Sequence, residues 1–203
     1  MSQENKRVII GYYNKSVILT FVGIVISIIG MLNVSNTDIA LTCLILAGIC
    51  DLFDGVIARK CKRTDKEKAF GVQIDSLADV ISFLVFPAVF AVFNNDNKII
   101  AAVVAGFYIL AGIERLGWFN VNAVEGKTGY YDGLPVTYSA LIIPIANVVL
   151  EFLKFQFKYT NYILLMVLAV LYVVNVKIKK PTGVWYIIFS VLAVATIVAI
   201  YLT

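Results

Sequence analysis

Long apolar segments alternate with short polar ones along almost the whole chain. Most apolar segments are about 17 to 25 residues long, the length that a helix needs to cross a hydrocarbon core of about 30 Å. A count of six spans would put the basic run KIKK (177–180) inside a helix in the membrane, which is costly. We therefore expect an all-α polytopic bundle, one domain over residues 1–203, with seven spans: 16–34, 38–59, 69–93, 98–118, 134–153, 160–176 and 182–202.

The distribution of cations predicts the orientation of this bundle. The chain is 61% hydrophobic and 15% charged, so lipid has to cover the apolar surface that a soluble domain of this length could not bury. If the N-terminus is cytoplasmic, 14 of the 17 Lys and Arg residues lie in cytoplasmic segments, as the positive-inside rule requires. The remaining three are Lys98, Lys154 and Lys158. We expect a multi-pass protein of the cell membrane.

The first residues do not have the pattern of a secretory signal, because a short apolar core and a cleavage site are missing. Residues 1–15 mix cations such as Lys6 and Arg7 with aliphatic and aromatic side chains. This mixture indicates a segment lying on an anionic membrane surface, with a solvated tail as the alternative. The net charge of +4 is explained by topology, so we expect no binding to nucleic acid.

Four carboxylates interrupt the apolar spans. Asp51 and Asp54 lie in the second span, and Asp75 and Asp79 in the third. Acidic residues inside a span are costly and therefore indicate a functional site. Each pair lies on one helical face, and the short cytoplasmic loop between the spans puts both pairs at a similar depth. All four carboxylates are expected to converge just below the cytoplasmic surface.

The chemistry of such a cluster is narrowed by the absence of histidine. Four close carboxylates stay ionised only if cations neutralise them, and two divalent ions would do so. Ligands that are all oxygen favour Mg²⁺ or Mn²⁺, with Ca²⁺ as an alternative. The three cysteines have no paired spacing and are expected to pack as ordinary thiols.

Two other interpretations of the four carboxylates stay open. They could form salt bridges to Arg59, Lys60 or Arg63, or they could line a cation or proton transport pathway.

The acids belong to a longer motif. Residues 51–79 read Asp-x2-Asp-Gly-x2-Ala-Arg-x11-Gly-x3-Asp-x3-Asp. This motif resembles the signature of the CDP-alcohol phosphatidyltransferase family at every fixed position. The resemblance implies a helical membrane enzyme, a homodimer, in which an alcohol displaces CMP from a CDP-linked lipid at a site with two metal ions. It implies Asp51, Asp54, Asp75 and Asp79 as metal ligands, Asp79 also as catalytic base, and a CDP site formed by Asp51, Gly55, Ala58, Arg59 and Gly71.

The flanking sequence is similar to one branch of that family, the phosphatidylserine synthases of bacteria and archaea. FGVQIDSLADVISF (70–83), ERLGWFN (114–120) and YDGLP (131–135) carry this similarity, with Gly117 and Trp118 departing from the usual Ala-Arg. It implies transfer of a phosphatidyl group from CDP-diacylglycerol to L-serine, with membrane lipids around the site. Arg115 and Asn120 are then candidates for binding the acceptor. The alternative for Arg115 is that it only anchors a helix end at the membrane interface. Inositol phosphate and glycerol phosphate are the alternative acceptors.

Overall fold

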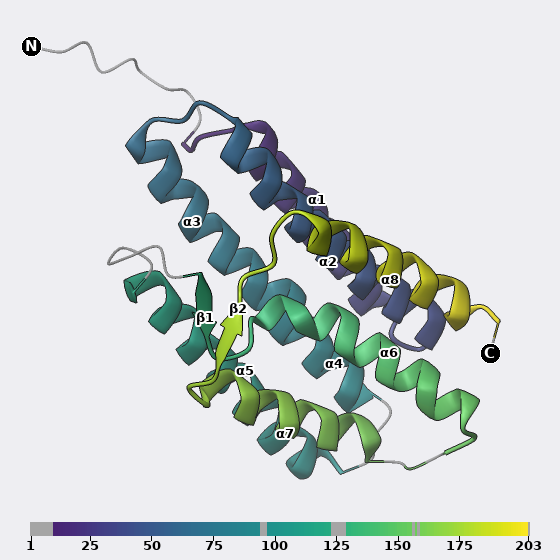
Figure 1. Ribbon diagram of the computed structural model, residues 1–203. Coiled ribbons are helices and arrows are strands. Elements are labelled where there is room, and N and C mark those ends of the chain that lie inside the picture. The colour runs from purple at the N-terminus through teal and green to yellow at the C-terminus, as the bar shows by residue number, and fades with distance from the viewer. Residues whose placement is uncertain (1–9, 94–96, 123–128, 156, 158, 203) are drawn as a thin grey trace, which may run out of the picture.

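The computed structural model describes residues 10–93, 97–122, 129–155, 157 and 159–202. Helices make up nearly all of the regular structure, and two short strands, β1 and β2, lie side by side (Figure 1). The elements are α1 (Lys15–Leu32), α2 (Thr37–Lys60), α3 (Asp65–Asp79), a π-helical segment (Val80–Val85), α4 (Phe86–Phe93), α5 (Lys98–Asn122), β1 (Tyr130–Asp132), a 3-10 turn (Val136–Tyr138), α6 (Ser139–Phe152), α7 (Thr160–Val173), β2 (Lys177–Lys179) and α8 (Val184–Ile200).

Seven apolar helical stretches coincide with the seven predicted spans. Four are long and apolar enough to cross a membrane: α1, α2, the continuous helix Asp65–Phe93 and α5. The other three are shorter apolar helices, Val136–Phe152, Thr160–Val173 and Val184–Ile200. The chain is thus an all-α multi-pass membrane protein, as expected, while the number of crossings and the orientation stay predictions.

Local sequence signals explain where several helices begin. Asn14 and Asn36 accept hydrogen bonds from backbone N–H groups in the first turns of α1 and α2. Thr64 and Glu67 form a reciprocal capping box at the start of α3. The capping box at Thr64 ends the short loop 61–64 between α2 and α3, and this loop brings the two acidic helices together.

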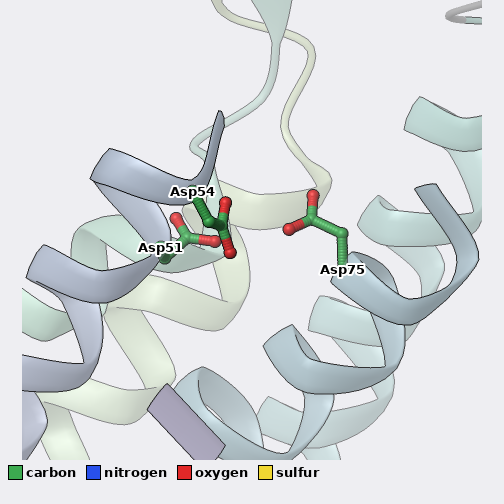
Figure 2. A group of neighbouring side chains, drawn as sticks. All are labelled: Asp51, Asp54 and Asp75. Carbon is green, nitrogen blue, oxygen red and sulfur yellow. The ribbon is translucent and has the colours of Figure 1, made fainter. Parts of the chain in front are cut away.

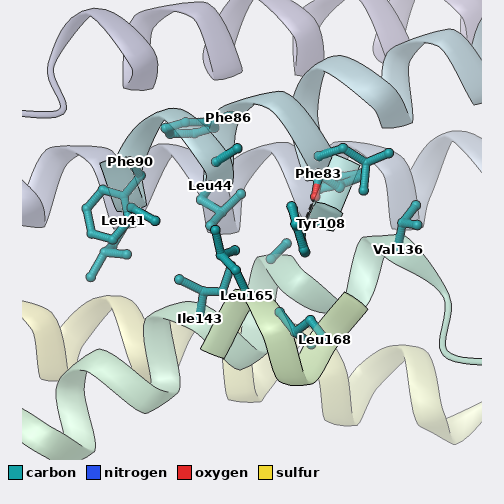
Figure 3. Close-up of a cluster of buried hydrophobic side chains, with 14 of the residues drawn as sticks. Leu41, Leu44, Phe83, Phe86, Phe90, Tyr108, Val136, Ile143, Leu165 and Leu168 are labelled. Carbon is teal, nitrogen blue, oxygen red and sulfur yellow. Dashed lines mark hydrogen bonds between the residues drawn. The ribbon is translucent and has the colours of Figure 1, made fainter. Parts of the chain in front are cut away.

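The buried core lies where α2, α4, α5, α6 and α7 meet (Figure 3). Phe83, Phe86, Leu44 and Leu165 are among its fully buried side chains. The outer surface is apolar as well: Val184, Ile187 and Val191 of α8 are each more than 60% exposed. An apolar surface of this kind requires a lipid environment.

The strand pair was not expected from the sequence. β1 and β2 are antiparallel, with Tyr131 opposite Ile178.

The predicted span 160–176 is shorter in the structure, because α7 ends at Val173 and the chain becomes extended before the basic run KIKK (177–180). This run therefore lies outside the helices, as the seven-span prediction requires. Of the predicted interfacial segment, residues 1–9 lie outside the described residues, and Tyr12 stacks on Phe70 of α3 with ring centroids 5.5 Å apart.

Candidate active site

Three carboxylates converge between α2 and α3. Asp51 and Asp54 project from α2 toward Asp75 on α3 (Figure 2). Carboxylate oxygens of these three residues all lie within 4.8 Å of one another. The predicted convergence of the two acidic helices is confirmed for these three side chains.

Asp79 lies one turn further along α3 and lines the same cavity. It is 8% exposed, and its Oδ1 atom is buried without a hydrogen-bond partner among the described residues. Its carboxyl interacts electrostatically with Asp51 and with Arg115. Asp79 thus faces the acidic cluster from deeper in the bundle, with one oxygen unused.

A buried hydroxyl holds one member of the acidic cluster, Asp54. Thr20 of α1 donates a hydrogen bond of 2.5 Å to Asp54 Oδ2, and both residues are buried. Within the described part of the chain, Arg59, Lys60 and Arg63 form no ion pair with the four carboxylates. The salt-bridge reading of the cluster is therefore not supported.

The cluster opens into a cavity of about 290 Å³. Most predicted site residues lie on its wall, whereas Ala58 and Gly71 do not. The wall also includes residues from the 3-10 turn and from α8, among them Thr137, Tyr186 and Phe189. The residues of the predicted site that line the cavity are Asp51, Asp54, Gly55, Arg59, Asp75, Asp79, Arg115 and Asn120.

Arginine side chains cover the two glycines of the motif. A Cβ atom on Gly55 would lie 3.6 Å from Arg59 Nη1, and one on Gly71 would lie 3.2 Å from Arg63 Nη1. Arg59 itself donates a hydrogen bond of 3.0 Å to the Tyr186 hydroxyl. Only the Gly71 contact is tighter than ordinary van der Waals distance, and of these four residues only Gly55 and Arg59 line the cavity.

Arg115 is the other cation of the cavity wall. It is 6% exposed, and its Nε and Nη2 atoms are buried without hydrogen-bond partners among the described residues. Its guanidinium stacks on Phe119 at 5.0 Å and on Tyr131 at 5.7 Å from the ring centroids. A buried guanidinium with unpaired donors is costly unless an anion binds it. The reading of Arg115 as an anchor at the membrane interface does not fit this burial.

Two further polar groups complete the wall near Arg115. The Asn120 amide donates a hydrogen bond of 2.8 Å to Ser76 Oγ, which ties α5 to α3. Tyr131 lies on β1, and burial raises the pKa of its hydroxyl while Arg115 lowers it in part. This hydroxyl remains protonated near neutral pH and can donate a hydrogen bond.

The donor set fits divalent cations. Three carboxylates converge, Asp79 has an unused oxygen nearby, and no nitrogen or sulfur ligand competes among the residues grouped there. Hard cations such as Mg²⁺ and Mn²⁺ prefer such all-oxygen sites. The cluster can therefore hold a metal ion.

Comparison with known protein families identifies the family of this chain. The family model described as CDP-alcohol phosphatidyltransferase matches residues 14–202. The chain belongs to the CDP-alcohol phosphatidyltransferase family. The matched residues include α8, although none of the sequence motifs lies in this helix.

Individual members of the CDP-alcohol phosphatidyltransferase family are similar over parts of the chain. A CDP-diacylglycerol–serine O-phosphatidyltransferase of Methanocaldococcus jannaschii is 32% identical over 76% of this chain and 71% of its own length. A protein of the same name from Saccharomyces cerevisiae is 36% identical over 55% of this chain. An archaetidylserine synthase of Methanothermobacter thermautotrophicus is 39% identical over 61% of this chain. The matches span 43% of the yeast relative and 50% of the Methanothermobacter relative.

Some residues of the site were missed by sequence reasoning. Thr20 and Tyr186 lie in ordinary apolar spans without a motif, so no sequence signal pointed to them. Tyr131 belongs to the YDGLP segment that carried the family resemblance, and this resemblance could have identified it. Thr20 and Tyr186 contact α2 from distant parts of the chain, and Tyr131 contacts Arg115 of α5.

Proposed function

We propose that this protein transfers a phosphatidyl-type group from CDP-diacylglycerol to L-serine and releases CMP. In this reaction the serine hydroxyl oxygen forms a bond to the lipid-bearing phosphorus. The bond from that phosphorus to the bridging oxygen breaks, and its electron pair leaves with CMP. The proposal is supported by family membership, by the names of the relatives and by one observation in particular, the unpaired guanidinium of Arg115 in the same cavity as the acidic cluster.

The charges of the cavity wall match the pyrophosphate of the donor. Four carboxylates and the two arginines Arg59 and Arg115 give a formal charge of −2. Two divalent cations, proposed to be Mg²⁺ or Mn²⁺, would change this to +2, which complements a doubly charged pyrophosphate diester. Bound metal ions would neutralise the charge that develops on the leaving CMP.

The side chains have separate tasks in the proposed site. Asp51, Asp54 and Asp75 hold the metal ions together with Asp79. Arg59, oriented by Tyr186, donates charge-assisted hydrogen bonds to phosphate. Gly55 lines the cavity beside Arg59. Ala58 and Gly71, which do not line the cavity, are proposed to flank the nucleotide site from the family resemblance alone.

Asp79 is the proposed base. A serine hydroxyl is weakly acidic, so a carboxylate within hydrogen-bond reach takes its proton as the attack develops. The buried and unpartnered Oδ1 of Asp79 is available for this proton.

Arg115 is the proposed partner of the serine carboxylate. Its unpaired Nε and Nη2 atoms offer two parallel N–H donors, the geometry that suits a carboxylate. Asn120 lines the wall beside it and is proposed to contact the acceptor as well. Inositol phosphate and glycerol phosphate carry a phosphate instead, which this pair of donors would also attract, so the acceptor has to be tested directly.

The test compares acceptors with purified protein in detergent. CDP-diacylglycerol and Mn²⁺ are supplied with serine, inositol phosphate or glycerol phosphate, and the lipid product is identified by mass spectrometry. We expect phosphatidylserine. Arg115→Ala should raise the KM for serine about tenfold or more, because a charge-assisted contact is lost. Lys98→Ala, at the exposed start of the same helix, is the control and should leave this KM unchanged.

Product formed only from inositol phosphate or glycerol phosphate would contradict serine as the acceptor. A cation or proton transporter is the competing function, since carboxylates inside the membrane also serve transport. Absence of CMP with every acceptor, together with ion or proton flux in sealed liposomes, would favour the transporter.

A further inference from the structure

The helix that carries Asp79 changes its geometry directly after this residue. α3 ends at Asp79, and the next six residues, Val80–Val85, form a π-helical segment. The Phe86 N–H donates to the Ile81 carbonyl, five residues earlier. Such a segment inserts an extra residue into a turn and is often found at functional sites. It therefore rotates the face that carries Asp75 and Asp79 relative to the buried face of α4.

A proline leaves one carbonyl of this segment without its usual donor. In an α-helix the Phe83 carbonyl would accept from the N–H four residues later, but residue 87 is proline and has no N–H. Buried away from water, an unpaired carbonyl is costly, and in membrane helices neighbouring side chains have to bind it.

Two hydroxyls from other helices bind this carbonyl. Tyr108 of α5 donates a hydrogen bond of 2.7 Å to the Phe83 oxygen, drawn as a dashed line in Figure 3. Ser139, at the start of α6, donates a second bond of 3.3 Å. The Tyr172 hydroxyl of α7 lies 3.0 Å from that of Tyr108. Three helices thus contribute to one buried polar network at the π-helical segment.

We propose that Tyr108, Ser139 and Tyr172 are positioning residues for Asp79. By holding the Phe83 carbonyl, they fix the π-helical turn and with it the direction in which Asp79 enters the cavity. Asp79 Oδ1 has no hydrogen-bond partner among the described residues, so the position of this oxygen depends on the backbone that carries it. The kinetic part of this inference rests on the proposed function.

The decisive variant is Tyr108→Phe, which keeps the ring and removes the hydroxyl. We expect kcat to fall at least about tenfold, because small displacements of a reacting group have large effects on rate. The KM values for serine and CDP-diacylglycerol should stay within about twofold, since Arg115 and Arg59 are not displaced. Ser139→Ala should have the same effect to a smaller degree. Tyr162→Phe, a buried tyrosine of α7 outside the network, is the matched control.

A double-mutant cycle separates positioning from general packing. In an Asp79→Asn background, Tyr108→Phe should change kcat little, because the group that it positions no longer acts. If the network only packs the core, both backgrounds should lose the same factor. Equal losses would therefore overturn the inference.

A second measurement does not depend on the acceptor. Mn²⁺ titration followed by electron paramagnetic resonance should show weaker binding to Tyr108→Phe than to wild type, and unchanged binding to Tyr162→Phe. This result would support the network even if serine proved not to be the acceptor. Wild-type kcat and wild-type Mn²⁺ affinity in Tyr108→Phe would overturn it. Should Tyr108→Phe fail to fold, Ser139→Ala carries the same two tests.

Discussion

At the scale of single residues, the four carboxylates differ in what surrounds them. Asp54 accepts a hydrogen bond from Thr20, whereas Asp79 has a buried oxygen without a partner and lies in electrostatic range of Arg115. A side chain that combines proximity to the acidic cluster with a free oxygen is best suited to accept a proton. Asp79 therefore differs from Asp51, Asp54 and Asp75, whose carboxylates converge on one point.

The first prediction concerns this proton. Asp79→Asn keeps the volume of the side chain and removes the base. We expect kcat to fall at least about 10²-fold, the lower range for losing a general base. Steady-state CMP release measures it, with Asp38→Asn in the first turn of α2 as a control outside the site. Near-normal turnover in Asp79→Asn would contradict the assignment of the base.

The second prediction concerns the hydroxyl that holds Asp54. Thr20→Val removes the donor at nearly constant volume, so Asp54 should be less well oriented as a ligand. We expect the affinity for Mn²⁺ to fall about tenfold, as is usual for residues that orient a metal ligand. Thr42→Val is the matched control, because the Thr42 hydroxyl is buried without a hydrogen-bond partner in the described chain. Equal Mn²⁺ affinities of the two variants would show that the Thr20 contact has no such role.

Much of the site could be predicted at this scale, for a physical reason. Carboxylates inside apolar spans are costly, so Asp51, Asp54, Asp75 and Asp79 stand out from any loop acid. Thr20 could not be found in the same way, since a threonine in a helix is inexpensive and its partner is 34 residues away. Ala58 and Gly71 were expected at the nucleotide site, yet they are not on the cavity wall.

At the scale of elements, the helices could be predicted from the sequence, whereas the π-helical segment and the two strands could not. Runs of apolar residues determine where a helix is favourable in lipid, so all seven ranges contain helices. The π-helical segment precedes Pro87, and its Phe83 carbonyl accepts hydrogen bonds from hydroxyls of α5 and α6. The pairing of β1 with β2 joins residues 45 to 49 apart, such as Tyr131 and Ile178. Contacts of this kind are set by tertiary structure and leave no local pattern.

The third prediction tests the connection between β1 and α7. Gly133 has φ +73° and donates its N–H to the Val176 carbonyl. A Cβ atom there would lie 2.5 Å from the backbone carbonyl oxygen of Tyr172. Gly133→Ala should therefore destabilise the protein by at least about 1 kcal/mol, because both the backbone conformation and the contact are unfavourable. Thermal unfolding in detergent measures the loss. Gly129→Ala, where a Cβ would meet open space, should unfold like wild type. A wild-type Tm for Gly133→Ala would contradict this role.

At the scale of the whole molecule, charge and helix order predict one topology. The start of α1 and the end of α8 lie at opposite ends of the bundle (Figure 1), as an odd number of crossings requires. The basic strand β2 and the loop between α2 and α3 would face the cytoplasm under the positive-inside rule. A homodimer and the cytoplasmic opening of the cavity remain predictions from the family resemblance.

The fourth prediction tests this topology with reporter fusions. Green fluorescent protein fused after Thr203 should be dark and alkaline phosphatase at the same point active, because the C-terminus is expected outside. Fusions ending at residue 180 should give the reverse result and serve as the control. A fluorescent fusion at the C-terminus would contradict the topology of seven crossings with a cytoplasmic N-terminus.

The central claim is that the acidic cluster holds divalent cations that enable release of CMP from a CDP-linked lipid. It is tested by measuring CMP release by purified protein in detergent, with CDP-diacylglycerol and serine, before and after chelation. We expect CMP with Mg²⁺ or Mn²⁺, none in excess EDTA, and recovery when either ion is restored but not with Zn²⁺. Full CMP release in excess EDTA, or none with any divalent ion, would contradict the account.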